Sequence, residues 1–163
     1  MALTGTFERT IDEKWRLAIP KPLKDGFSVR DVGELYLAPG NEGCLSVYSP
    51  EGFDEFAKRV ASVSPGRANV RSFLRLFYSK AERVVLDKQS RIRIPDRLIT
   101  HASLQREVVI LGVHDHAEIW DKSAWDTFLE QTSFHFDELT SETLENSVFE
   151  PQAEKAALQR LKG

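Results

Sequence analysis

The chain has 163 residues, of which 41% are hydrophobic and 29% charged, with a formal net charge of −3. This composition excludes a disordered, collagen-like or disulfide-rich chain and fits one compact domain or two small ones. The lone Cys44 cannot form an internal disulfide, and the sequence shows neither a signal peptide nor the roughly 20 apolar residues of a membrane helix, so we expect a soluble cytoplasmic protein.

Charge is unevenly distributed along the chain. Residues 1–100 hold 17 Lys and Arg against 13 Asp and Glu, whereas residues 101–163 hold 5 against 12. The front of the chain is therefore mildly basic although the whole chain is acidic. A net negative charge alone argues against a nucleic-acid-binding protein, but a basic N-terminal part is compatible with nucleic-acid binding.

Residues 1–60 predict short strands followed by a helix. Pro20 ends the second strand and suits the first turn of a short helix, and Ser49 before Pro50 predicts the cap and first turn of a longer one. Cys44 precedes an apolar strand and is predicted to lie in the core. Residues of high β-propensity predict strands over 6–11, 16–19, 34–38 and 45–48.

Residues 61–78 predict an amphipathic linker helix. Four apolar residues recur there at helical spacing: Val70, Phe73, Leu74 and Phe77. Three arginines four residues apart would form one basic stripe: Arg67, Arg71 and Arg75. The stripe could touch nucleic acid, face solvent or contact an acidic neighbour.

Residues 79–132 predict a second set of the same elements. Residues 133–163 are predicted to form an acidic extension that could end in a helix over 151–162. Pro95 opens a short helix and Asp121 caps the last one. The run from His114 to His116 is either a hairpin turn or a pair of metal ligands, and the turn is favoured because other ligands at metal-site spacing are missing. Strands are expected over 83–86, 91–94, 108–113 and 118–120.

These two sets are copies of one module. The segment Asp12 to Pro20 aligns with Asp87 to Pro95 at an offset of 75 residues, and both contain Asp-x-x-x-Arg-x-x-Ile-Pro. A second segment beginning at Tyr48 aligns with one beginning at Trp120 at an offset of 72, with aromatics at matching places. Two matches in the same order indicate an internal duplication.

The paired Asp-x-x-x-Arg motifs are the candidate binding site. In a turn between two strands, Asp12 and Asp87 would orient the loops and hold the guanidinium groups of Arg16 and Arg91. An oriented arginine at a loop tip suits guanine or phosphate. The alternative is an ion pair that only fixes the hairpin. The remaining predicted DNA-binding residues are Lys14, Lys88 and Arg93.

Further basic residues either extend this footprint or form an ordinary solvated surface: Arg9, Lys21, Lys24 and Arg97. The sequence has no phosphate-binding glycine loop, nucleophile elbow or zinc-protease motif. We therefore predict that the chain is not an enzyme and uses no metal or cofactor.

With these loops the chain resembles the MraZ family of bacterial transcriptional regulators, over roughly residues 5–130. The family signature, Asp-x-Lys-Gly-Arg followed by an apolar strand and Pro, is matched by two sets: Asp12, Lys14, Arg16 and Pro20; Asp87, Arg91 and Pro95. The resemblance implies a mixed α+β, mainly β fold. In it, two tandem swapped-hairpin AbrB-like (SpoVT-AbrB) modules form a pseudo-dimeric β-barrel with peripheral helices.

The resemblance also implies a function. It implies binding to repeated promoter boxes upstream of cell-division and cell-wall genes. It also implies a ring-like homo-oligomer associated with the nucleoid, in which Arg16 and Arg91 would contact the DNA. No small-molecule substrate or membrane partner is expected.

Three residues depart from the signature. Trp15 and Ser90 replace the turn glycine, and Gln89 replaces the second lysine. Because tryptophan takes a positive φ badly, we expect the first loop to be reshaped and Trp15 to be exposed. This motivates an alternative function, an oligomeric protein-interaction scaffold with weakened or lost DNA binding.

Overall fold

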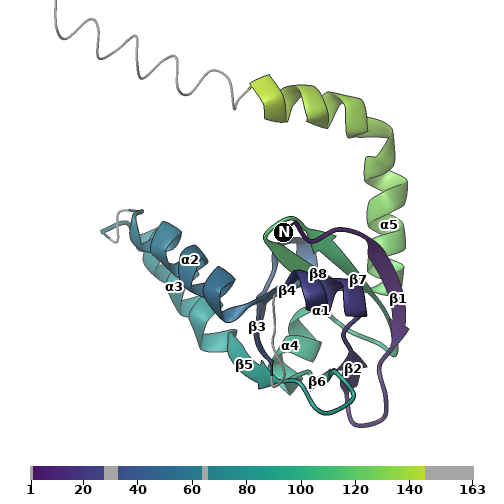
Figure 1. Ribbon diagram of the computed structural model, residues 1–163. Helices are drawn as coiled ribbons and strands as arrows, with labels where there is room; N and C mark the ends of the chain where they lie inside the picture. Colours follow the sequence, from purple (N-terminus) through teal and green to yellow (C-terminus); the bar gives the residue numbers. More distant parts are fainter. Residues whose placement is uncertain (1, 28–32, 64–65, 146–163) are drawn as a thin grey trace, which may run out of the picture. The chain divides into compact units, whose positions relative to one another are not determined.

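The computed structural model describes residues 2–27, 33–63 and 66–145, which fall into two compact units, 1–125 and 126–163. The first half of the chain forms β1 (Thr6–Thr10), β2 (Arg16–Ala18), α1 (Lys21–Gly26), β3 (Glu34–Pro39), the short helix η1 (Asn41–Gly43), β4 (Leu45–Tyr48) and α2 (Pro50–Ala61). Figure 1 shows these elements in purple to blue.

The second half continues with α3 (Ala68–Lys80), β5 (Glu82–Val85), β6 (Arg91–Arg93), α4 (Asp96–His101), β7 (Glu107–Val113), β8 (His116–Asp121) and α5 (Lys122–Thr132). The predicted strands and helices are confirmed with bounds shifted by one or two residues. The exception is the linker helix, because α2 extends to Ala61 and α3 begins only at Ala68.

Strands from both copies pair with each other, so the copies share their sheets instead of forming one sheet each. A six-stranded antiparallel sheet has the order β1-β7-β8-β4-β3-β5, and β2 pairs with β6 in a two-stranded sheet. The first strand of each copy thus pairs with the third strand of the other. The fold is mixed α and β and mainly sheet, as predicted, while β1 and β5 remain the edges of the larger sheet.

The register of these pairs places an approximate twofold axis through both sheets. Leu17 lies opposite Ile92 in the two-stranded sheet, and the two are equivalent under the offset of 75 residues. Ser46 lies opposite Glu118 in the larger sheet, and they are equivalent under the offset of 72. The duplication read from the sequence is therefore a structural pseudo-symmetry.

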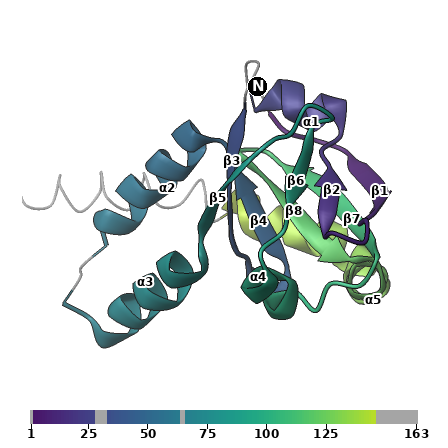
Figure 2. The same ribbon diagram turned by 90° about the horizontal axis from the view of Figure 1, so that it is seen from below.

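The main core lies between the two sheets and the short helices α1 and α4. Side chains alternate along β2 and β6, so Leu17 and Ile92 are fully buried while the flanking residues face outward. Each short helix begins directly after a proline and buries one leucine, Leu23 or Leu98, again 75 residues apart. Figure 2 shows β2 and β6 side by side, with α1 and α4 flanking them.

A second, smaller cluster joins α2 and α3 to the sheet. The cap predicted for α2 is confirmed, because Ser49 Oγ accepts a hydrogen bond of 3.0 Å from Gly52 N. Phe53 stacks on Tyr36 of β3 with ring centroids 4.4 Å apart and also approaches Phe77 of α3 at 6.1 Å. This aromatic cluster is separate from the main core.

The second unit is helical as far as it is described. The last residues of α5 are followed by the short helix η2 (Ser133–His135) and by a helix over 136–145. Phe134 and Phe136 are exposed. The terminal helix predicted over 151–162 lies outside the described residues. Within the described ranges, no helix combines the length and the apolar composition that crossing a membrane requires.

Candidate nucleic-acid interface

The first Asp-x-x-x-Arg motif forms a turn organised by its aspartate. Asp12 Oδ1 accepts hydrogen bonds from the backbone N–H groups of Lys14 at 2.9 Å and Arg16 at 2.8 Å. Its Oδ2 accepts one from Arg16 Nε at 2.7 Å. One carboxylate therefore fixes both the turn backbone and the direction of the arginine, as a side chain that mimics a backbone turn does.

The second motif repeats this geometry. Asp87 Oδ1 accepts from the N–H groups of Gln89 and Arg91, both at 2.9 Å, and Oδ2 accepts from Arg91 Nε at 2.8 Å. Hydrogen bonds to the arginine backbone, and then to its side chain, lower the pKa of both Asp12 and Asp87 below the ordinary value. Both carboxylates are therefore ionised at neutral pH.

The expected reshaping of the first loop is wrong. Trp15 and Ser90 both have a φ of 59°, so both turns keep the left-handed conformation that glycine usually supplies. That conformation costs roughly 1–2 kcal/mol in a residue with a Cβ. Three hydrogen bonds accepted by the ionised carboxylate of Asp12, from Lys14 N, Arg16 N and Arg16 Nε, hold the first turn in this conformation.

The two turns are also tied to each other. Ile94 N donates to the carbonyl of Trp15 at 2.9 Å, and Ile19 N donates to the carbonyl of Ser90 at 2.9 Å. The carbonyl of each left-handed residue is thus held by the strand end of the other copy. The loops cannot move independently of the two-stranded sheet.

The outward face of the two-stranded sheet gathers three arginines. Arg16 lies directly opposite Arg93, and Ala18 lies opposite Arg91, while the residues between them point into the core. Arg91 Nη1 also lies 3.8 Å from Asp12 Oδ2, which links the two motifs. The predicted site residues of β2 and β6 are therefore brought together on one surface.

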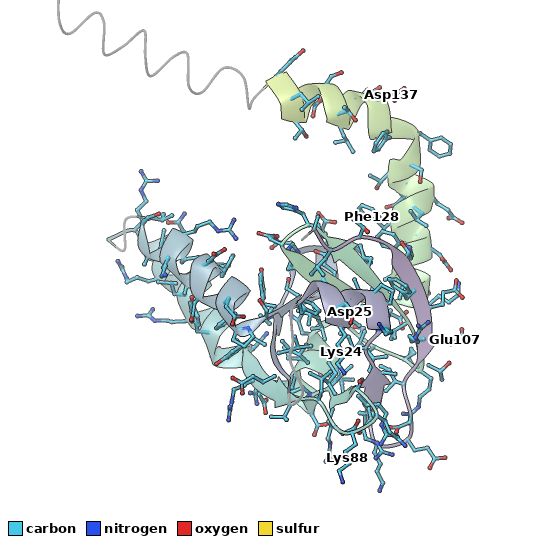
Figure 3. All side chains as sticks on the ribbon, viewed as in Figure 1. Lys24, Asp25, Lys88, Glu107, Phe128 and Asp137 are labelled. Atoms are coloured by element: carbon cyan, nitrogen blue, oxygen red, sulfur yellow. The ribbon has the colours of Figure 1, made fainter. Side chains whose placement is uncertain are left out.

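Two lysines extend this surface at the turns. Lys14 and Lys88 are both exposed, and Figure 3 shows Lys88 projecting from the end of the unit where β2 and β6 lie. The loops differ in charge because Glu13 stands where the second copy has Lys88. Residues 12–18 are neutral overall, whereas residues 87–93 carry a net charge of +2.

Trp15 is not the exposed aromatic that we expected. It is half-buried and packs against the main core. The guanidinium carbon of Arg106 lies 4.5 Å from the centroid of its ring, and Arg106 Nη1 donates to the carbonyl of Asp12 at 2.7 Å. Sequence reasoning missed Arg106, because it lies 94 residues from Asp12 and belongs to no motif.

Three of the four further basic residues are engaged by their own neighbours. Lys21 pairs with Asp25 at 2.8 Å, and Arg97 pairs with Glu82 at 2.6 Å. Arg9 donates to the adjacent Glu8 carbonyl at 2.7 Å. The fourth, Lys24, donates from Nζ to Ser90 Oγ at 2.9 Å and so supports the second loop directly.

The arginines of the predicted basic stripe lie within α3 or at its N-cap, and not on β2 or β6. Arg67, Arg71 and Arg75 are exposed along one helix, and Arg71 donates to the carbonyl of Gly66 at 2.7 Å. Their solvent-facing arrangement is confirmed. A nucleic-acid role for them stays a prediction.

The His-Asp-His run is a hairpin turn, as favoured from the sequence. Val113 pairs with His116 at the end of β7 and β8, with His114 and Asp115 between them. His116 Nδ1 lies 2.8 Å from Asp115 Oδ1, and Nε2 lies 3.4 Å from Glu118 Oε2. Across the described ranges, no group of three or more His, Cys, Asp or Glu is placed to hold a metal ion.

We expect His116 to make stability fall as pH rises above neutrality. Its hydrogen bonds to Glu118 and Asp115 raise the pKa of His116 above the ordinary value. The folded protein therefore binds this proton more tightly than the unfolded chain. The stabilisation is complete below the unfolded pKa of about 6.5 and disappears as pH rises through the higher folded pKa.

Urea unfolding of the wild type and of His116→Gln at pH 6 and pH 8 checks this expectation. The free energy of unfolding should decrease more over this range in the wild type than in the variant. The range stops at pH 8 because burial raises the pKa of the Cys44 thiol to about 12. Loss of that proton from the unfolded chain makes stability fall further with pH, but only as pH rises above the ordinary cysteine pKa of roughly 8.5. Equal slopes for the two proteins would contradict the role of His116.

Comparison with known proteins agrees with the duplicated loops. The family model of the MraZ protein, described as antitoxin-like, matches the chain twice, over residues 2–76 and 77–147. The chain belongs to the MraZ family. The MraZ transcriptional regulator of Moorella thermoacetica is 35% identical over 141 residues, which cover 86% of this chain and 96% of that protein.

Two other MraZ relatives are equally similar. The transcriptional regulator MraZ of Lactobacillus helveticus is 36% identical over 83% of this chain and 92% of its own length. That of Desulforamulus reducens is 35% identical over the same shares. These relatives are named as regulators of transcription and not as enzymes, so the prediction that this chain is no enzyme is confirmed.

Proposed function

We propose that the chain is a sequence-specific DNA-binding transcriptional regulator that acts through its two Asp-x-x-x-Arg loops. The observation that carries the proposal is the convergence of both loops on one two-stranded sheet. Its outward face presents Arg16, Arg91 and Arg93, with Lys14 and Lys88 at the turns. The names of the MraZ relatives support the regulatory role.

The shape of this surface suits the major groove of DNA. That groove is wide enough to admit a two-stranded β-ribbon, and guanine there offers two acceptors to one arginine fork. Arginines fixed by carboxylates lose less side-chain entropy when they bind. Asp12 and Asp87 thus prepare the loops without contacting the negatively charged DNA themselves.

Assembly and target genes form the wider part of the proposal. We infer two tandem AbrB-like modules, residues 1–60 and 79–132, that form a pseudo-dimeric barrel; the strand exchange supports this view. A ring-like homo-oligomer would present several ribbons to repeated promoter boxes. Cell-division and cell-wall genes, in the nucleoid of the cytoplasm, are the proposed targets.

The test is binding to the DNA upstream of the protein's own gene, measured by electrophoretic mobility shift at two salt concentrations. The double variant Arg16→Ala, Arg91→Ala should bind at least about 30-fold more weakly, because each arginine–base pair contributes roughly 1–3 kcal/mol. The salt dependence should also decrease as phosphate contacts are lost.

A matched control removes the same charge elsewhere. Arg67 is the N-cap residue of α3, Arg75 lies within the helix and both are exposed, so the double variant Arg67→Ala, Arg75→Ala should bind nearly as well as the wild type. Weaker binding by this control alone would move the interface to α3. If the Arg16 and Arg91 variant binds as tightly as the wild type, the loops are not the DNA contacts.

The alternative is a protein-interaction scaffold that has lost DNA binding. The neutral first loop, with Glu13 and the partly buried Trp15, favours it. Selection of bound DNA from a genomic fragment pool separates the two functions, because a scaffold would enrich no sequence.

A further inference from the structure

The two loops are positioned by different side chains. Ile11 N donates to the carbonyl of Arg106 at 2.7 Å, and its counterpart Leu86 N donates to the carbonyl of Gly33 at 2.9 Å. Arg106 and Gly33 therefore occupy equivalent places, one beside each loop. Gly33 has no side chain, so only the first loop can be held by a side chain from this position.

Arg106 makes three contacts with the first loop. Its carbonyl accepts from Ile11, its Nη1 donates to the carbonyl of Asp12 at 2.7 Å, and its guanidinium lies over the Trp15 ring at 4.5 Å. A guanidinium at this distance is attracted by the π-system of the ring and stacks on its face. The residue bridges the two copies, since it lies in the second and the loop lies in the first.

A different side-chain contact holds the second loop. Ser90, the counterpart of Trp15, has a hydroxyl that accepts a hydrogen bond from Lys24 Nζ at 2.9 Å. The counterpart of Lys24 is Ile99, an apolar residue that together with Trp15 packs against the main core. The hydrogen bond that supports the second loop therefore has no equivalent at the first loop, because its two positions there are occupied by Trp15 and Ile99.

We propose that Arg106 is a positioning residue for DNA binding: it holds Trp15 in its left-handed turn and thereby keeps Asp12 and Arg16 in place. This inference rests on the proposed DNA-binding function. Arg106 acts through the loop, and its effect depends on the tryptophan that stands where the family signature has glycine. Without the ring, the guanidinium has nothing to stack on and the turn needs no support.

A double-mutant cycle tests this dependence. DNA affinity is measured for the wild type, Arg106→Gln, Trp15→Gly and the double variant. Arg106→Gln should weaken binding about two- to fivefold more in the wild-type background than in the Trp15→Gly background, the size expected of a stacked cation at an exposed site. Equal effects in the two backgrounds would overturn the proposal and make Arg106 an independent DNA contact.

Two further variants separate charge from geometry. Lys58→Gln removes one positive charge from α2, away from the two-stranded sheet in both ribbon views (Figures 1 and 2), and should change affinity less than Arg106→Gln does. Arg106→Lys keeps the charge but loses the planar fork, so it should show part of the loss. Binding by Arg106→Lys equal to the wild type would mean that charge alone matters.

A measurement on the protein without DNA tests the positioning role of Arg106 separately from the proposed function. In two-dimensional NMR of the protein alone, Arg106→Gln should shift the indole N–H signal of Trp15 and the Nε–H signal of Arg16, while the indole N–H signal of Trp120 stays in place. If these shifts occur but the wild type binds no DNA, the proposed function fails and the positioning contact stands. If the Trp15 and Arg16 signals do not move, the positioning role fails whatever the wild type binds.

Discussion

Replacing Leu17 with alanine is expected to lower the free energy of unfolding by about 2–5 kcal/mol, the range for a fully buried leucine. Leu17 has no exposed surface and lies directly opposite Ile92 on the approximate twofold axis. These two side chains are the inner face of the two-stranded sheet. Their removal leaves a cavity beneath the surface that carries Arg16 and Arg91.

Urea unfolding at several protein concentrations measures this effect, because self-association would add a concentration-dependent contribution. Val85→Ala is the matched control, since Val85 lies in a strand with 53% of its surface exposed; its cost should stay within about 0.5 kcal/mol. A loss below about 1 kcal/mol for Leu17→Ala would mean that the two-stranded sheet is not anchored through this residue.

Much of the fold was predictable because two local rules apply twice. Alternating apolar residues define the strands, and a proline at each of two equivalent positions ends a strand and starts a helix. The offset of 72 residues also predicted matching aromatic pairs. Tyr48 and Phe53 meet edge to face at 5.9 Å, and their counterparts Trp120 and Trp125 do so at 5.3 Å.

The pairing of strands could not be read from the residues alone. A first strand such as β1 satisfies its hydrogen bonds equally well with the third strand of its own copy or of the other. Equivalent copies present equivalent strands, so the repeat does not distinguish the two arrangements. In the structure β1 pairs with β7 and β5 pairs with β3, so the first strand of each copy lies beside the third strand of the other.

The candidate site was predictable only within each motif. Asp12 and Arg16 are four residues apart, so a turn brings them together by local geometry alone. Lys24 and Ser90 are 66 residues apart, and their contact follows from the strand exchange. The prediction for Trp15 failed because the intrinsic preference of one residue was weighed without the hydrogen bonds of its neighbour Asp12.

Phe53→Ala is expected to lower the free energy needed to detach α2 and α3 from the sheet by about 3–5 kcal/mol. Phe53 is buried at the centre of the aromatic cluster, where its ring stacks on Tyr36 and approaches Phe77. Because this cluster shares no residue with the main core, its loss should open the two helices locally before the sheets unfold.

Native-state hydrogen exchange distinguishes local opening from global unfolding. In Phe53→Ala the amides of α2 and α3 should lose protection, while those of β7 and β8, whose strands pair on both sides, should keep most of theirs. Phe73→Ala is the control: Phe73 is 41% exposed and stacks only on Phe77 among the ring contacts seen in the described residues. An equal loss of protection in both groups of amides would show that the aromatic cluster and the main core unfold as one cooperative unit, and the helices would then be an integral part of the scaffold that holds the two Asp-x-x-x-Arg loops.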